Sequence, residues 1–230
     1  MPQLLLPAAT MRSPTALAGQ SDIRDENVYS ALVVQHTGTG QQKVFTVPQG
    51  QAIPKLNGTS TASTNPHHVT YSDLTTNLTK AGEFGSSLGD GSIRGLGITI
   101  EQAAYTLTTG APRNFGATQF EVSDLLAKTS FELKIGGKRQ IIGPTFLFPA
   151  LGAVTGSIAT TGNAQTPALV NAGGRIRMLK VPVPVARNDT LEGTFSVATG
   201  ASLAFSDTSS NGQPTLIWFT LLTTVKGDVR

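Results

Sequence analysis

The chain has 230 residues, enough for one large domain or two small ones, and only 13% of them are charged, about half the usual share in a soluble domain. A hydrophobic content of 39% excludes a disordered chain, the lack of heptads excludes a coiled coil, and the absence of cysteine excludes disulfide scaffolds, Cys-ligated metals and cysteine catalysis. The formal net charge of +3 is too small to predict a nucleic-acid interface by itself.

Residues 1–27 have no regular hydrophobic period and are interrupted by Pro2, Pro7 and Pro14. We expect either a flexible tail or an extended arm that becomes ordered against a neighbouring subunit. The start is not typical of a signal peptide, because it lacks a basic region, and no stretch reaches the roughly 18–20 apolar residues of a membrane span. In an arm, the anchors would be leucines: Leu4, Leu5, Leu6 and Leu17.

The next part of the chain predicts two short elements followed by a long loop. Residues 28–35 form an apolar run that fits a strand or a short helix. Residues 43–47 alternate between polar and apolar and end at Pro48-Gln49-Gly50, which predicts a strand and a turn. Residues 54–92 are polar and rich in turn residues, so we expect a surface loop of a length that is often functional.

Residues 92–105 alternate and predict a further strand. Strict alternation would place Ile93 and Gly95 on one face of this strand, and Arg94 and Leu96 on the other.

The clearest local prediction is a hairpin. Residues 131–135 alternate with a period of two, Gly136-Gly137 fits a two-residue turn, and residues 138–142 continue as the second strand. Before it, residues 124–128 fit a single helical turn with Ser123 as its N-cap.

The second half of the chain predicts extended segments around another loop. Residues 143–149 are apolar and bracketed by prolines, which fits an edge strand or a corner. Residues 152–174 are rich in Gly, Ala, Thr and Asn and predict a long loop, with room for short hidden strands. Residues 176–186 are extended, because Pro182 and Pro184 forbid a helix. Further strands are predicted over residues 191–197, 203–205 and 215–225.

About eight to ten strands with almost no helix predict an all-β protein, built as an antiparallel sandwich, jelly roll or barrel. A double jelly roll needs about sixteen strands, so a single jelly roll with large loops is favoured, and a double one needs strands hidden in the two loops. The predicted organisation is an extended N-terminal arm over residues 1–27 and one β-domain over residues 28–230 with long loops at 54–92 and 152–174.

Two metal sites are conceivable in the first long loop. His67, His68 and Asp73 could bind a metal, but adjacent residues of an extended chain point in opposite directions, so a solvated loop is favoured. Asp90, with Asp73 or Glu83, could bind calcium through oxygen, although the Asp-x-Asp-x-Asp-Gly spacing is missing. We therefore predict no metal-binding residues, with a structural calcium ion left open.

No catalytic motif stands out. A Gly-x-Ser-x-Gly elbow is absent, no spacing selects a carboxylate pair, and the glycine-rich residues 85–91 lack the Lys-Ser/Thr of a phosphate loop. We predict no catalytic or cofactor-binding residues and no enzyme activity.

Trp218 lies in the most apolar segment, so core packing is its expected role.

Two small basic groups lie on predicted strands, where solvated faces or intersubunit salt links are favoured over nucleic-acid contact. These groups are Arg175, Arg177 and Lys180, and Lys134, Lys138 and Arg139.

Three segments together suggest a family. The first segment predicts a strand, a Gly-Gly turn, a strand and a proline-bracketed corner, and it reads FELKIGGKRQIIGPTFLFPALGAVTG (131–156). The second is an extended segment, VPVPVARNDTLEGTFSV. The third is the end of the chain, LIWFTLLTTVKGDVR. This succession resembles the jelly-roll major capsid proteins of tailless icosahedral bacteriophages, including those with an internal membrane. The resemblance covers about residues 40–230 and is clearer in the second half.

The resemblance implies a capsid protein that self-assembles into capsomers of an icosahedral shell, located in the virion and made in the host cytoplasm. Its partners would be copies of itself, other virion proteins, and an internal viral membrane or the genome on the inner face, with no cofactor and no small-molecule substrate. The alternatives are a vertex, spike or receptor-binding protein that uses residues 54–92 to contact a host glycan and, more remotely, a β-sandwich enzyme acting on polysaccharide.

Overall fold

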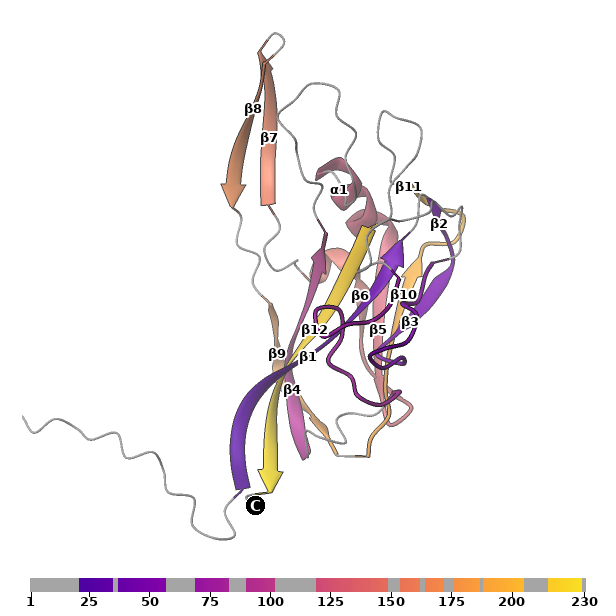
Figure 1. Ribbon diagram of the computed structural model, residues 1–230, viewed down its shortest axis with the longest axis vertical. Helices are drawn as coiled ribbons and strands as arrows, with labels where there is room; N and C mark the ends of the chain where they lie inside the picture. The colour runs from indigo at the N-terminus through magenta and orange to yellow at the C-terminus, as the bar shows by residue number, and fades with distance from the viewer. Residues whose placement is uncertain are drawn as a thin grey trace, which may run out of the picture.

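Two antiparallel four-stranded sheets pack against each other as a β-sandwich (Figure 1). The computed structural model describes residues 21–34, 37–56, 69–82, 90–101, 119–148, 154–161, 164–171, 176–186, 188–204 and 215–228. The first sheet has the order β1 (Ser21–Val34), β12 (Thr215–Asp228), β4 (Asp90–Ile100) and β9 (Arg177–Val185). The second has the order β3 (Gln41–Val44), β10 (Leu191–Val197), β5 (Thr129–Ile135) and β6 (Lys138–Pro144).

The remaining described elements are small. A helix α1 (Gln119–Lys128) precedes β5, and a 3-10 turn η2 (Thr145–Leu147) follows β6. Two-stranded pairs join β2 (Thr37–Gly38) to β11 (Leu203–Ala204), and β7 (Val154–Thr161) to β8 (Ala164–Asn171). In the described ranges, no helix is long and apolar enough to cross a bilayer.

The strand pairing is nested. If the eight strands of the two sheets are numbered in chain order, the first pairs with the eighth, the second with the seventh, the third with the sixth and the fourth with the fifth, all antiparallel. A long antiparallel ribbon wound around a core gives this nesting, which is the arrangement of a jelly roll. The antiparallel all-β sandwich predicted from the sequence is confirmed.

Aromatic rings from both sheets fill the centre. The Phe131 ring on β5 stacks on the Phe219 ring of β12 with centroids 4.9 Å apart, and Phe195 of β10 meets Phe219 edge-on at 5.6 Å. All three side chains are fully buried. Gly193 leaves the space for this packing, because a Cβ there would lie 2.6 Å from the Val44 side chain. Alternate residues of β5 and β10 are buried, so their period of two encodes the inner face of the second sheet.

The predicted alternation of β4 is wrong at one point. Ile93 and Leu96 are both fully buried, although strict alternation would put them on opposite faces. The pairing with β12 and β9 shifts between Ile93 and Gly95, so Arg94 is an extra, exposed residue. A β-bulge of this kind resets the alternation, which brings both apolar side chains to the core.

The hairpin prediction is confirmed, and the helix prediction needs a correction. Gly136 and Gly137 have φ values of 56° and 76°, as a two-residue turn with a left-handed backbone requires, and they join β5 to β6. The helix is longer than the predicted turn over residues 124–128, and Ser123 is an exposed residue inside it rather than its N-cap. Apolar residues spaced three apart, Val122 and Leu125, face the core and sustain the longer helix.

Two predicted irregular regions contain strands. β1 begins at Ser21, so residues 21–27 pair with β12 instead of belonging to an arm. The rest of that predicted arm, with Leu4, Leu5, Leu6 and Leu17, lies outside the described residues. The predicted loop over residues 152–174 contains the β7–β8 hairpin. Short strands within this loop are among the possibilities that the sequence leaves open.

The first long loop packs on the first sheet. Tyr71 of this loop and Ile53 just before it cover Ala31 and Leu216 on the outer face, and together with Val33 they form a second buried cluster. The same loop closes part of the free edge of β1, because the Val33 amide donates to the Pro54 carbonyl at 2.9 Å. Figure 1 shows this loop crossing in front of β1 and β12.

Candidate interaction surface

The structure separates the predicted metal ligands. His67, His68 and Glu83 lie outside the described residues, while Asp73 is an exposed loop residue and Asp90 begins β4. No three His, Cys, Asp or Glu side chains come together in the part of the chain that the structure describes.

The outer face of the second sheet is polar and internally paired. The Lys43 Nζ lies 2.8 Å from Glu192 Oε2, and Glu132 accepts from Arg139 Nε at 2.6 Å and lies 3.7 Å from Lys134 Nζ. The hydrogen bond from Arg139 is the main reason why the pKa of Glu132 lies below its ordinary value. Lys43, Glu192, Glu132 and Lys134 border an open depression of about 580 Å³. Exposed pairs of this kind stabilise a fold little, and they leave this face nearly neutral.

The predicted basic groups therefore have different environments. Lys134 and Arg139 make salt bridges to Glu132 of the same chain, whereas the sequence predicts solvated strand faces or intersubunit salt links. Arg177 lies over the Phe148 ring, 5.4 Å from its centroid, and Lys180 is exposed. Arg175 lies outside the described residues.

Trp218 is only partly buried, so the prediction of a core residue is half right. Its side chain packs on the second cluster, on the outer face of the first sheet, and its indole Nε1 donates to the Leu74 carbonyl at 3.2 Å.

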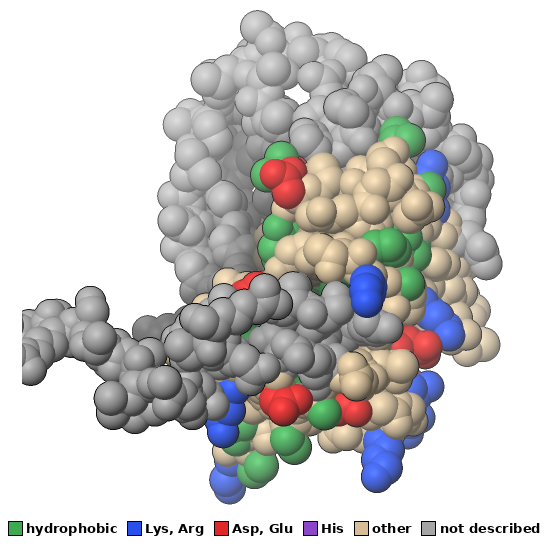
Figure 2. All heavy atoms as spheres, turned by 60° about the horizontal axis from the view of Figure 1, so that its bottom comes forward, with side chains coloured by type: hydrophobic (Ala, Val, Ile, Leu, Met, Phe, Trp, Pro, Cys, Tyr) green, Lys and Arg blue, Asp and Glu red, His purple; other side chains and the backbone are tan. Residues whose placement is uncertain are grey.

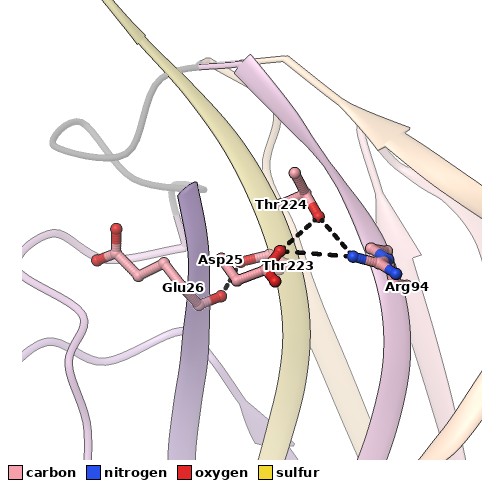
Figure 3. A network of polar contacts seen from close by, with 5 residues as sticks. All are labelled: Asp25, Glu26, Arg94, Thr223 and Thr224. Atoms are coloured by element: carbon pink, nitrogen blue, oxygen red, sulfur yellow. Dashed lines mark hydrogen bonds and ion pairs between the residues drawn. The ribbon is translucent and has the colours of Figure 1, made fainter. Parts of the chain in front are cut away.

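A polar network crosses the outer face of the first sheet (Figure 3). Asp25 on β1 accepts hydrogen bonds from Thr224 Oγ1 of β12 at 2.9 Å and from Arg94 Nη1 of β4 at 3.5 Å. Beside it, the Thr223 hydroxyl donates to the Glu26 carbonyl. A small depression of about 200 Å³ lies between Asp25, Leu222 and Met178. The network ties three strands together and fixes the position of a carboxylate near the β1 edge.

Large hydrophobic side chains remain exposed along one side of the sandwich. β6 and β9 are edge strands of the two sheets, and they lie on the same side, because Arg177 of β9 reaches Phe148 just after η2. We call β6, η2 and β9 the β6–β9 side. It holds five of the eight exposed large hydrophobic residues in the described part of the chain: Ile142 (59% exposed), Phe146 (58%), Leu147 (39%), Met178 (54%) and Val181 (74%).

The sequence of β9 explains why its apolar residues are exposed. Pro182 and Pro184 lack a backbone N–H, which confines such a strand to a sheet edge. Residues 179–182 have no partner on β4, since the pairing jumps from Met178 to Val183, and Val181 lies in this bulge. Sequence reasoning found the proline-containing extended segment, but it did not predict that β6 and β9 would share one side.

The β6–β9 side is also basic. β6, η2 and β9 contain Lys138, Arg139, Arg177 and Lys180 and no Asp or Glu. The space-filling view from below shows hydrophobic groups scattered over a surface of mostly uncharged side chains, with acidic and basic groups both present, most of them towards the bottom (Figure 2). Such a surface can bind another protein through apolar contacts and direct the encounter through its positive charge.

A comparison with known protein families, curated proteins and solved structures finds no match to this chain.

Proposed function

We propose that the protein is a viral structural protein, a capsid protein that assembles with copies of itself into the capsomers of an icosahedral bacteriophage shell. The observation that supports this most is the β6–β9 side, on which Phe146, Val181 and three other large hydrophobic side chains are exposed. Burying such a patch against another protein removes it from water, which favours association.

The strand order adds support. Jelly rolls of eight strands are a common architecture of viral capsid domains, and the nested pairing fits that architecture. A fold alone does not define a function, so the strand order supports the proposed function only together with the exposed β6–β9 side.

The low charge of the chain is consistent with assembly. With 13% charged residues, an isolated subunit has little of the surface charge that keeps proteins apart in solution. In the proposed shell, most of this surface would be covered by neighbouring copies. The proposal extends to other virion proteins as partners, and to an internal membrane or the genome on the inner face.

Light scattering and negative-stain electron microscopy of the purified full chain test this proposal. We expect capsomers or closed particles of uniform size, because regular interfaces between copies close into symmetric assemblies. A chain that stays monomeric at high concentration, or that is missing from the virions of its source, would refute the capsid function.

A further inference from the structure

We infer that the β6–β9 side of one copy packs against the β1 side of the next copy, in a head-to-tail contact. This inference rests on the proposed function and specifies which two surfaces would form the contact. The β1 side consists of β1 and the residues 69–74 of the loop that covers it. It exposes the other three large hydrophobic residues of the described chain: Ile23 (63% exposed), Val69 (47%) and Leu74 (64%).

β1 and β9 are the opposite edges of the first sheet, separated by β12 and β4. Met178 of β9 and Asp25 of β1 border the same small depression, but the two strands do not pair within the molecule. An extensive contact between the two edges therefore requires two copies, and each copy offers one edge of each kind. A contact between two different surfaces of identical chains is heterologous, and it closes into a ring when the rotation between copies permits.

Charge complementarity favours a second copy as the partner. β6, η2 and β9 have four cations and no carboxylate, although Arg139 among them is paired with Glu132 of β5, whereas the β1 side exposes the carboxylates Asp25 and Asp73. The side chain of Asp25 is 71% exposed although it belongs to the network with Arg94. Opposite charges on two facing surfaces select the correct pairing and disfavour contact of either side with itself.

The backbone at both edges favours docking through side chains. Pro182 and Pro184 remove two donors from the β9 edge, so this edge is a poor template for another strand. On the β1 edge, the Val33 amide is already bonded to Pro54, and the Asn77 amide donates to the Tyr29 carbonyl at 3.3 Å. Two blocked edges can meet through exposed apolar side chains without fusing into a continuous sheet.

Cross-linking of single-cysteine variants tests the contact, because the natural chain contains no cysteine. Leu74→Cys and Val181→Cys are mixed in equal amounts, assembled, and treated with a short bis-maleimide linker. A second mixture contains Ile23→Cys and Met178→Cys. All four side chains are more than half exposed, so the variants should fold. Thr199→Cys, in an exposed turn at neither side, replaces one partner in each mixture as a control.

We expect linked dimers from at least one of the two mixtures, at a yield at least fivefold above the same variants assembled alone or mixed with the Thr199→Cys control. Assembled particles with no linked dimers in either mixture would overturn the head-to-tail contact and leave the capsid function standing. Efficient linking of Val181→Cys to itself would also overturn it, in favour of a two-fold contact. A protein that forms no assembly at all would refute both the contact and the proposed function.

Discussion

At the scale of single residues, Tyr71 connects the first long loop to the sandwich. Its side chain is 3% exposed, and its hydroxyl donates to the Ala31 carbonyl and lies 3.1 Å from Ser30 Oγ. Ser30 Oγ in turn accepts from the amide of Phe45 at 3.3 Å. Phe45 has a φ of 63°, a left-handed conformation that is strained for an aromatic residue. One buried group of hydroxyls therefore fixes both the loop and a strained turn after β3.

Tyr71→Phe should lower the free energy of unfolding by about 1–3 kcal/mol, because it leaves the Ala31 carbonyl without this donor. Burial also raises the pKa of Tyr71 from 10.0 to about 12. The folded state therefore favours the neutral phenol, which contributes stability below pH 10 and loses that contribution as the pH rises through about 12. Urea unfolding at pH 7 and across the range from pH 10 to 12 measures both effects.

The natural protein should lose stability over that alkaline range more steeply than the Tyr71→Phe variant. Equal slopes for the two proteins would show that Tyr71 ionises as freely in the folded state as in the unfolded one.

At the scale of elements, the β5–β6 hairpin depends on its two glycines. Gly137→Val places a β-branched side chain at a φ of 76°, which should cost about 1–3 kcal/mol of unfolding free energy. Gly137→Asn is the matched control, because asparagine tolerates this conformation and no neighbouring atom lies near a new Cβ. Thermal unfolding of the two variants should separate them clearly. Equal melting temperatures for the two variants would show that the left-handed backbone at Gly137 does not determine which residues are tolerated there.

The same elements show what the sequence can predict. The β5–β6 hairpin is predictable because its signals, a period of two and Gly-Gly, are local. The bulge at Arg94 is not, because it arises from pairing with β12 and β9, which are distant in the chain. Residues 21–27 are polar except for Ile23, and they become a strand only through their register with β12, in which Asp25 faces Thr224.

The candidate surface was predictable only in part. The sequence shows two basic residues, Arg177 and Lys180, on the β9 segment. It also predicts that a strand with two prolines lies at an exposed sheet edge. That β6 joins β9 on one side, opposite to β1, follows from the strand order, which nonlocal pairing determines. The period-two pattern of β6 and β9 is also weak, so exposed Ile142 and Val181 resemble core residues in the sequence.

At the scale of the whole molecule, the sandwich has two chemically different sides and a neutral polar face. Stacked phenylalanine rings pack in the core between the two sheets, and the first long loop covers part of the outer face of the first sheet. What remains uncovered is apolar and basic at β6–β9, and apolar and acidic at β1. These two sides are the surfaces through which the proposed self-assembly would occur.

Sedimentation velocity of the purified full chain over a wide concentration range tests self-assembly most directly. Val181→Asp serves as the variant, because it puts a charge on a side chain that is 74% exposed in the subunit, and Thr199→Asp adds the same charge in an exposed turn as the control. We predict that the natural chain and Thr199→Asp shift from the 23.9 kDa monomer to large species as the protein concentration rises. Val181→Asp should need a roughly tenfold higher concentration to form the same species. A single monomeric species at every concentration for the natural chain would contradict the account.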